Sequence, residues 1–333
     1  MEYNFHSINK VMIVAEIGNN HEGNIDVALQ MIESAAKAGV DAVKFQTFIP
    51  EDFVINSDLT RLERLNRFKL SNEEFLLLAK KAKELNVIFF STPLDLKSAL
   101  FLNQIQPLFK ISSGDNNFYP LIEQVASFNK PTIISTGLAD LDHLDRLYKF
   151  WSSVGGAYKN LCFMHCVSSY PVPDSQVNLG AIFTLRNKFK NLTIGYSDHT
   201  LGIQASILAA ATGAKIIEKH FTLNKKYSDF RDHQLSADPE EMANLVIQIK
   251  EVSKMLGDGK KQKQNCECEM EELMRRSIAA SKDLEAGKTL TPDDIIWVRP
   301  GTGIAPGLEK QVIGRKLIHG LKHGDLINNE HLI

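Results

Sequence analysis

The sequence has 333 residues, 44% of them hydrophobic and 23% charged, with a formal net charge of −2. This is the composition of an ordinary globular protein, and it excludes extensive disorder. The charges are interspersed, so the sequence has no concentrated basic segment for binding nucleic acid or an anionic membrane. The length exceeds one ordinary domain but suits a barrel of about 250 residues with a small second domain.

The N-terminal residues 1–18 place acidic and polar residues before a short apolar run. This pattern is not that of a signal peptide, and the run is too short to span a bilayer. We therefore expect a cytoplasmic protein.

Short runs of β-branched and aromatic residues then alternate with longer amphipathic stretches. Eight runs predict strands, at residues 11–18, 41–47, 87–92, 107–113, 131–137, 161–168, 192–197 and 214–221. Several of the stretches between them end in Gly or Asn, which favour a left-handed C-cap at the end of a helix. Alternating strands and helices predict a parallel sheet, so residues 1–256 are predicted to form a (β/α)8 TIM barrel of the α/β class.

The character of the sequence changes after the predicted barrel. Residues 257–273 are polar and lack a strong helical or strand pattern, which predicts a linker. Residues 274–333 contain short strand-like pieces separated by turn sequences, which predict a small β-rich domain.

The four cysteines give no recognisable metal or disulfide pattern. Cys162 and Cys166 fall in a predicted strand, and Cys266 and Cys268 form C-E-C in a charged segment. Because this spacing resembles no familiar zinc motif, we interpret all four as incidental thiols.

Polar and ionisable side chains collect at the C-terminal ends of the predicted strands, where barrels of this kind build their active sites. Lys44, Glu218 and His220 even lie within otherwise apolar strands, where an ionisable group is costly to bury unless it is paired or liganded. The other members of this set are Glu16, Gln46, Thr92, Lys110, Ser113, Ser135, Ser168, Tyr170, Ser197 and His199. The pattern predicts one shared site.

A divalent metal ion is the first ligand that this set suggests. His199 follows the seventh strand and His220 ends the eighth, so their imidazoles lie on neighbouring strands and can share one ion. Asp198 and Glu218 are near enough in sequence to orient these imidazoles.

An anionic substrate is the second ligand that this set of residues suggests. Lys44 and Lys110, with the hydroxyls of Thr92, Ser113 and Ser135, supply cations and donors for a phosphate or a carboxylate. No G-x-x-x-x-G-K-[ST] or G-x-G-x-x-G segment occurs, which argues against a nucleotide cofactor.

Together these motifs resemble the sialic acid synthase (NeuB-type) family, including its legionaminic, pseudaminic and spore-coat polysaccharide relatives. The segments that carry the resemblance are A-E-I-G-N-N-H-E-G (15–23), V-K-F-Q-T (43–47), F-F-S-T-P (89–93), F-K-I-S-S-G-D (109–115), I-S-T-G (134–137), H-C-V-S-S-Y-P (165–171), G-Y-S-D-H-T (195–200), E-K-H-F-T (218–222) and R-D-H-Q-L-S-A-D-P (231–239). The tail, with R-R-S-I-A-A-S-K-D (275–283), W-V-R-P-G-T-G (297–303) and G-R-K-L (314–317), is similar to the family's SAF (antifreeze-like) domain.

The resemblance implies a nonulosonic (sialic-type) acid synthase. Such an enzyme condenses phosphoenolpyruvate with an N-acylated amino sugar and water, and releases phosphate by C–O cleavage. The sugar would be N-acetylmannosamine or a 2,4-diacetamido-6-deoxy sugar. His199 and His220 would hold the metal, with Mn²⁺ expected and Mg²⁺ or Co²⁺ as alternatives.

The resemblance also implies roles for individual residues. Glu16 and Asp232 would be catalytic, and either could be the general base. Phosphoenolpyruvate would be bound by Lys44, Thr92, Lys110, Ser113, Ser135, Ser168 and Ser197, and the sugar by Gln46, Asp115, Tyr170, Asp232 and Arg299. Arg299 would reach the N-acyl group in a partner subunit's barrel, which implies a domain-exchanged homodimer. Asp115 and Ser168 depart from the family's usual Glu and Asn, so the acceptor sugar can differ from N-acetylmannosamine.

Two other classes of function stay open from the sequence. Lys44 could be the nucleophilic amine of a Schiff-base aldolase, which would work without a metal. Alternatively, the chain could be a non-catalytic glycan-binding protein that acts through its tail, although the tail has no regular repeated Thr face and the ionisable cluster of the barrel would have no role.

Overall fold

The computed structural model describes residue 5 and residues 10–333. The chain forms two compact units, Met1–Gly257 and Asp258–Ile333. No helix within these described residues has the length and apolar character needed to cross a membrane.

The described residues of the first unit form an eight-stranded parallel barrel. Its strands are β1 Met12–Gly18, β2 Ala42–Thr47, β3 Ile88–Pro93, β4 Phe109–Ile111, β5 Thr132–Ser135, β6 Leu161–Cys166, β7 Thr193–Asp198 and β8 Ile216–His220. They pair in the order β3-β2-β1-β8-β7-β6-β5-β4, and the two end strands β3 and β4 lie against each other. The sheet therefore closes, and the predicted TIM barrel is confirmed, with each predicted strand found in place.

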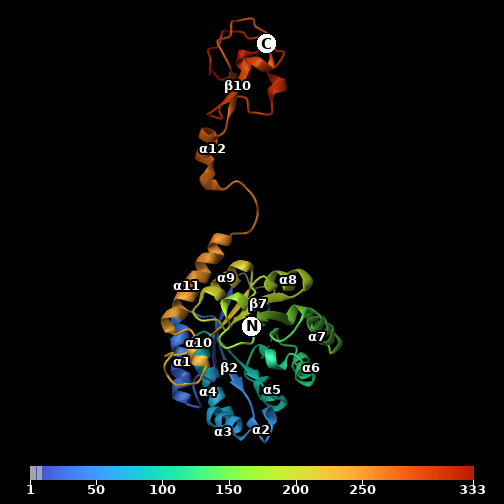
Figure 1. Cartoon of the computed structure of the whole chain (residues 1–333), viewed down its shortest axis with the longest axis vertical. Helices are drawn as coiled ribbons and strands as arrows, with labels where there is room; N and C mark the ends of the chain where they lie inside the picture. The colour runs from blue at the N-terminus through green and yellow to red at the C-terminus, as the bar shows by residue number, and fades with distance from the viewer. Residues whose placement is uncertain (1–4, 6–9) are drawn as a thin grey trace. The chain divides into compact units, whose positions relative to one another are not determined.

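Helices surround this sheet, as Figure 1 shows. They are α1 Ile25–Ala38, α2 Pro50–Phe53, α3 Leu59–Phe68, α4 Asn72–Glu84, α5 Leu96–Leu102, α6 Tyr119–Ser127, α7 Leu141–Ser153, α8 Ala181–Lys188, α9 Gln204–Thr212, α10 Asp232–Leu235 and α11 Pro239–Leu256. Their ends follow ordinary capping chemistry. Asn24 caps the start of α1 through its side chain, and Gly39 ends it in the left-handed conformation that glycine adopts at low cost.

The alternation of side chains along the strands determines which residues face the barrel interior. Met12 and Val14 of β1 belong to the apolar cluster inside the barrel, whereas Ile13, Ala15 and Ile17 pack against the helices. Because side chains alternate along a strand, Glu16 follows Met12 and Val14 on the inner face.

The same rule applies around the barrel. The inner apolar cluster consists of Phe5, Met12, Val14, Ala42, Phe90, Leu108, Ile133, Cys162, Met164 and Ile216. In β2 and β8, Ala42 and Ile216 precede Lys44 and Glu218 by two residues. An apolar layer therefore fills the barrel directly below the ionisable side chains.

The helices α2 and α3 lie in the long connection that follows β2, at the end of the barrel where the strands terminate. The rings of Phe68 in α3 and Phe230 in the segment after β8 meet edge to face, with centroids 5.1 Å apart. Gly23, with φ +81°, also lies against α3, since a Cβ there would come within 2.0 Å of the backbone oxygen of Arg67. These two contacts hold α3 against the ends of β1 and β8.

The second unit has its own small core. Strands β9 Ser277–Ala280 and β10 Ile295–Val298 pair antiparallel, and the residues around them form an apolar cluster that includes Ile278, Leu290 and Leu317. This agrees with the predicted β-rich tail. The segment 257–273, predicted to be a linker without a strong helical pattern, contains a 3₁₀ turn and most of helix α12 Cys268–Met274.

Candidate active site

A cavity of about 350 Å³ opens at the C-terminal ends of the barrel strands. Each strand contributes a polar or ionisable residue to its lining, either within the strand or just after it. From β1 to β8 these are Glu16, Lys44, Thr92, Lys110, Ser135, Cys166, Ser197 and Glu218. Strand register explains the convergence, since Glu16 pairs with Lys44 across β1 and β2, and Ser197 pairs with Glu218 across β7 and β8.

Most of the predicted site residues line this cavity. Those brought together are Glu16, Lys44, Gln46, Thr92, Lys110, Ser113, Ser135, Ser168, Tyr170, Ser197, His199, His220 and Asp232. Asp115 lies outside the lining that the described residues form, and its carboxylate accepts a hydrogen bond from the Ser112 hydroxyl. Arg299 belongs to the second unit.

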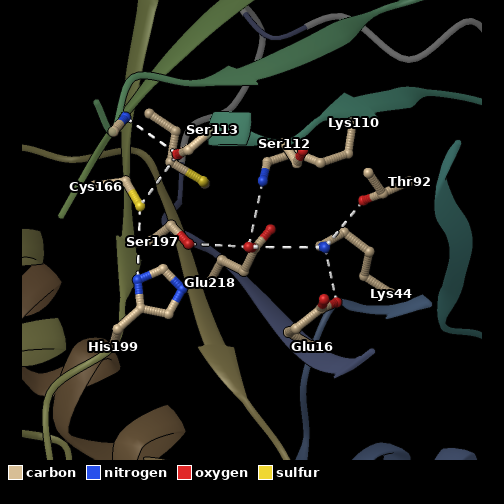
Figure 2. Close-up of polar contacts among 12 residues, drawn as sticks. Glu16, Lys44, Thr92, Lys110, Ser112, Ser113, Cys166, Ser197, His199 and Glu218 are labelled. Carbon is tan, nitrogen blue, oxygen red and sulfur yellow. Dashed lines mark hydrogen bonds and ion pairs between the residues drawn. The ribbon is translucent and has the colours of Figure 1, made fainter. Parts of the chain in front are cut away.

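Two lysines and two carboxylates form the charged centre of the cavity (Figure 2). Lys44 Nζ lies 2.8 Å from Glu16 Oε2 and 3.8 Å from Glu218 Oε1. Lys110 Nζ lies 3.4 Å from the same Glu218 oxygen. All four side chains are buried, and each lysine lies beside at least one carboxylate. This pairing is needed because an unpaired charge is costly to bury.

The two carboxylates have different proton affinities. Burial raises the pKa of Glu16 to about 7, in spite of the opposing attraction of Lys44. Burial would also raise the pKa of Glu218, but the two lysines outweigh it and bring that pKa to about 2. Glu218 is thus a permanent counter-ion, whereas Glu16 is able to accept and release a proton near neutral pH.

The two lysines also differ. Burial disfavours both ammonium groups, but Glu16 and Glu218 outweigh it at Lys44 and raise its pKa. At Lys110 burial prevails over Glu218, and the pKa is lowered. Lys44 is therefore held as a cation.

Several buried polar atoms of this lining have no hydrogen-bond partner among residue 5 and residues 10–333. They include Ser135 Oγ, Glu218 Oε2 and His220 Nδ1. A buried polar atom without a partner costs about 1–3 kcal/mol, and such atoms are rare in folded proteins. Their concentration in one cavity is what a site for a polar ligand requires.

The imidazoles of His199 and His220 lie side by side, with ring centroids 5.3 Å apart. His199 Nδ1 is 3.0 Å from the Val167 carbonyl, which only accepts, so Nδ1 carries the proton and Nε2 keeps its lone pair. Burial lowers the pKa of His199 to about 4 and that of His220 well below its usual value. Two neutral imidazoles, one with an unpartnered nitrogen, fit a divalent metal ion.

The groups found beside the two imidazoles differ from those predicted to orient them. The Val167 carbonyl orients His199, whereas the Asp198 carboxylate accepts from Thr200 and Ser206 and lies 3.4 Å from Lys219 Nζ. Asp198 thus secures the turn that carries His199. Glu218 contacts lysines and Ser197, which donates to it at 3.0 Å.

Three of the residues predicted to bind the sugar, Gln46, Tyr170 and Asp232, lie around the charged centre. Gln46 Nε2 donates to Glu16 Oε1 at 3.1 Å, which ties the amide to the predicted general base. The ring of Tyr170 has its centroid 4.3 Å from that of His199. Burial raises the pKa of Asp232, although Arg231 Nε lies 3.4 Å from its carboxylate and acts in the opposite direction.

Gly137, just after β5, permits the close approach of Ser113 and Ser168, two residues predicted to bind phosphoenolpyruvate. Gly137 N donates to Ser113 Oγ at 3.1 Å. A Cβ at Gly137 would come within 2.6 Å of Ser113 Oγ and 2.3 Å of Ser168 Oγ. The I-S-T-G segment therefore requires its final glycine so that both hydroxyls can lie in the site.

Some residues that line the cavity were not predicted from the sequence as site residues. Cys166, interpreted there as an incidental thiol, lies in the cavity with its sulfur 3.6 Å from His199 Nδ1. Arg61, Arg64 and Arg231 also line it. The i, i+3 spacing of Arg61 and Arg64 places them on one helix face, and this spacing is the feature of the sequence from which their shared position could have been predicted.

Comparisons with known proteins agree with this geometry. The model of the NeuB family matches residues 31–261, and the model of the SAF domain matches residues 275–333. The chain is 42% identical to an uncharacterized protein of Methanocaldococcus jannaschii, over 96% of this chain and 94% of that protein. It is 38% identical to an N,N'-diacetyllegionaminic acid synthase of Legionella pneumophila, over 96% and 94% of the two chains. A crystal structure of the N-acetylneuraminic acid (sialic acid) synthetase of Leptospira borgpetersenii is similar with a TM-score of 0.75 and 36% identity, over 79% of this chain and 90% of that one.

Proposed function

Because the chain belongs to the NeuB family and has a SAF domain at residues 275–333, we propose that it condenses phosphoenolpyruvate with an N-acylated amino sugar to form a nonulosonic acid. The observation that carries the proposal is the cavity itself. It combines two lysines, two neutral imidazoles and two carboxylates of different pKa at the strand ends of a TM barrel. This set suits a small anionic substrate that reacts with an aldehyde.

Phosphoenolpyruvate binds above the apolar layer in this proposal. Lys44 and Lys110 supply positive charge for its phosphate and carboxylate, and the hydroxyls of Thr92, Ser113, Ser135, Ser168 and Ser197 supply hydrogen bonds. Ser135 Oγ has no other partner among the described residues, so a substrate oxygen would satisfy it.

The reaction joins C3 of phosphoenolpyruvate to the aldehyde carbon of the open-chain sugar. Water then adds to C2, and the C–O bond to phosphate breaks, so that one water is consumed and one phosphate is released. Glu16, with a pKa near 7, accepts the proton of that water, while Lys44 keeps the carboxylate oriented. Asp232 hydrogen-bonds the sugar hydroxyls or takes over the proton transfer, and Gln46 and Tyr170 position the sugar.

A divalent metal ion, with Mn²⁺ as the first choice, is also part of the proposal. His199 and His220 would hold it, and when bound it would polarise the aldehyde oxygen of the sugar. The described residues offer no cluster of three or more His, Cys, Asp or Glu side chains for a metal. Water and substrate would therefore supply the other ligands, as in catalytic rather than structural metal sites.

Phosphate release from phosphoenolpyruvate tests the proposal directly. We expect release with Mn²⁺ only when an N-acyl amino sugar is present, and loss of release on EDTA treatment with recovery on adding Mn²⁺. N-acetylmannosamine and 2,4-diacetamido-6-deoxy sugars should be compared, with a sugar-free reaction as control. Metal-independent activity with a borohydride-trapped adduct on Lys44 would instead establish an aldolase, which the raised pKa of this lysine disfavours.

We also propose that Arg299 binds the sugar's N-acyl group in the barrel of a partner subunit, so that the active form is a domain-exchanged homodimer. A mixing experiment tests this proposal. Glu16→Gln and Arg299→Ala proteins should each be inactive, and random subunit exchange between them should restore about a quarter of the wild-type sites.

The control mixes Glu16→Gln with Asp232→Asn, since both changes lie in the first unit. Exchanged dimers of this pair contain no intact site, so no activity should return. Absence of recovery in the first mixture, after exchange has been verified with labelled subunits, would rule out a site shared between subunits.

A further inference from the structure

The loop that follows β1 carries the segment N-N-H-E-G, residues 19–23. Asn20 and Glu22 of this segment lie outside the cavity lining that the described residues form. Both side chains instead contact the part of the chain that follows β8, residues 222–236, which we call the β8 loop. This loop contains Asp232, which lines the cavity.

Asn20 fixes the two ends of the β8 loop. Its side chain is fully buried, and its Nδ2 donates to the Phe221 carbonyl at 2.8 Å and to Ser236 Oγ at 3.0 Å. The Ser236 hydroxyl in turn donates to the Asp232 carbonyl at 2.6 Å. Phe221 directly precedes the β8 loop and Ser236 ends it, so one amide holds both ends against the loop after β1.

Glu22 fixes the middle of the β8 loop. Its Oε1 accepts a hydrogen bond from the Ser228 hydroxyl and lies 3.3 Å from His233 Nε2. Because a carboxylate only accepts, the imidazole donates from Nε2. On its other side, His233 Nδ1 lies 2.8 Å from Thr222 Oγ1. The buried His233 ring therefore links the Glu22 carboxylate to the start of the β8 loop.

The backbone of Glu22 is held in an unfavourable conformation. Its φ is +47°, in the left-handed region that residues other than Gly, Asn and Asp rarely adopt. Such a conformation persists where contacts of the surrounding structure hold it. At Glu22 the side-chain contacts are Ser228, His233 and, at 4.0 Å, Arg67. These are the interactions that compensate for the backbone conformation.

The part of the β8 loop that reaches the cavity has little stability of its own. Asp232 begins α10, which is four residues long, and a helix of this length is unstable in isolation. We propose that Asn20 and Glu22 are positioning residues for Asp232, which hold the β8 loop so that the Asp232 carboxylate faces the sugar. The inference rests on the proposed function, in which Asp232 contacts the sugar or transfers a proton.

Two substitutions of Glu22 test this role. Asparagine readily adopts the left-handed conformation, but it is one methylene too short to keep the contacts with Ser228 and His233. Glutamine keeps the length, and its carbonyl accepts from both donors. Glu22→Asn should lower kcat/KM for the sugar about tenfold, the cost of losing a hydrogen bond to a charged group. Glu22→Gln should stay within about threefold of the wild type.

The KM for phosphoenolpyruvate and the Mn²⁺ affinity should not change in either variant. Glu16, both lysines and both imidazoles lie outside the β8 loop, so displacement of that loop leaves them in place. Glu84→Asn is the matched control, because it makes the same chemical change at an exposed site at the end of α4. Its kinetic constants should equal those of the wild type.

Combination with Asp232→Ala tests whether Glu22 acts through Asp232. Once the Asp232 side chain is removed, its position no longer matters, so adding Glu22→Asn should cause almost no further loss of kcat/KM for the sugar. Effects of independent sites are additive, whereas those of coupled sites are not. A loss by the same factor in both backgrounds would overturn the proposed positioning role.

Hydrogen exchange measures the same contacts without turnover. Backbone amides of residues 222–236 should exchange faster in Glu22→Asn than in the wild type, Glu22→Gln and Glu84→Asn. Ser228→Ala removes one donor to Glu22 from the other side, and it should have the same effect in smaller measure. This variant also provides the test if Glu22→Asn does not fold.

The outcomes distinguish this inference from the proposed function. Unchanged exchange of residues 222–236 in Glu22→Asn and Ser228→Ala would overturn the inference, even if the wild type releases phosphate. Equal losses in Glu22→Asn and Glu22→Gln would also overturn it, since glutamine keeps both contacts. Faster exchange in Glu22→Asn, without phosphate release by the wild type from any acceptor, would keep the role of Glu22 in holding the β8 loop and overturn the synthase.

Discussion

Replacing Glu16 by Gln is expected to lower kcat for sugar-dependent phosphate release by about 10²- to 10⁴-fold, the usual contribution of a general base. The amide keeps the size of the side chain and its contact with Gln46, but it cannot accept the proton of water. The negative charge beside Lys44 is lost as well, so the KM for phosphoenolpyruvate should not rise. Steady-state kinetics with each substrate varied in turn measures both quantities.

Glu33→Gln is the control, because it makes the same chemical change in a surface pair with Lys81. It should leave kcat within about twofold, since a surface ion pair contributes little. The parallel variant Asp232→Asn identifies the base. If Asp232→Asn lowers kcat by this amount and Glu16→Gln only raises the sugar KM, Asp232 is the general base and the proposed roles are exchanged.

Replacing His220 or His199 by Ala is expected to weaken metal binding strongly and to abolish phosphate release. Each variant leaves one imidazole. Changing a group that only orients a metal ligand weakens metal binding by roughly 10- to 100-fold, and the loss of a direct ligand should weaken Mn²⁺ binding by more than this. Titration of Mn²⁺ monitored by electron paramagnetic resonance measures the affinity without depending on turnover.

His319→Ala serves as the control, since His319 is exposed in the second unit. Its Mn²⁺ affinity and activity should equal those of the wild type. Unchanged Mn²⁺ affinity in both His199→Ala and His220→Ala would contradict the assignment of this pair as metal ligands, whatever happens to the activity.

The barrel and the centre of its site were predictable because both follow from local patterns. Strand alternation places Glu16, Lys44 and Glu218 on the inner face after apolar residues, and a parallel barrel brings strand ends together. No contact between distant segments had to be known in advance. The residue types at these ends were then enough to predict a site for an anion and a metal.

The surroundings of this centre were not predictable in the same way. The sequence shows Arg61 and Arg64 at helical spacing, but their place beside the site depends on Phe68 meeting Phe230, more than 150 residues later. Asp198 was expected to orient His199, yet strand alternation turns it away from the cavity, toward Lys219 and Ser206. Asp115 was expected to contact the sugar, and its hydrogen bond with Ser112 holds it within the turn after β4.

The segment 257–273 shows a further limit of local patterns. Residues 268–274 are too few to display a clear helical period, and α12 was therefore missed. A helix of this length has little stability of its own in water, and none of its residues is buried, so it leaves no apolar pattern in the sequence.

The apolar layer inside the barrel has a consequence for the order of events in turnover. It fills the interior below Lys44 and Lys110, so the cavity is closed at its base, and a molecule bound at depth is covered by whatever binds above it. In the proposed reaction phosphoenolpyruvate lies on the lysines and the sugar lies above it, so we expect the sugar to bind second. We then expect a sugar that binds first to block the route for phosphoenolpyruvate, and excess acceptor sugar to inhibit the proposed reaction.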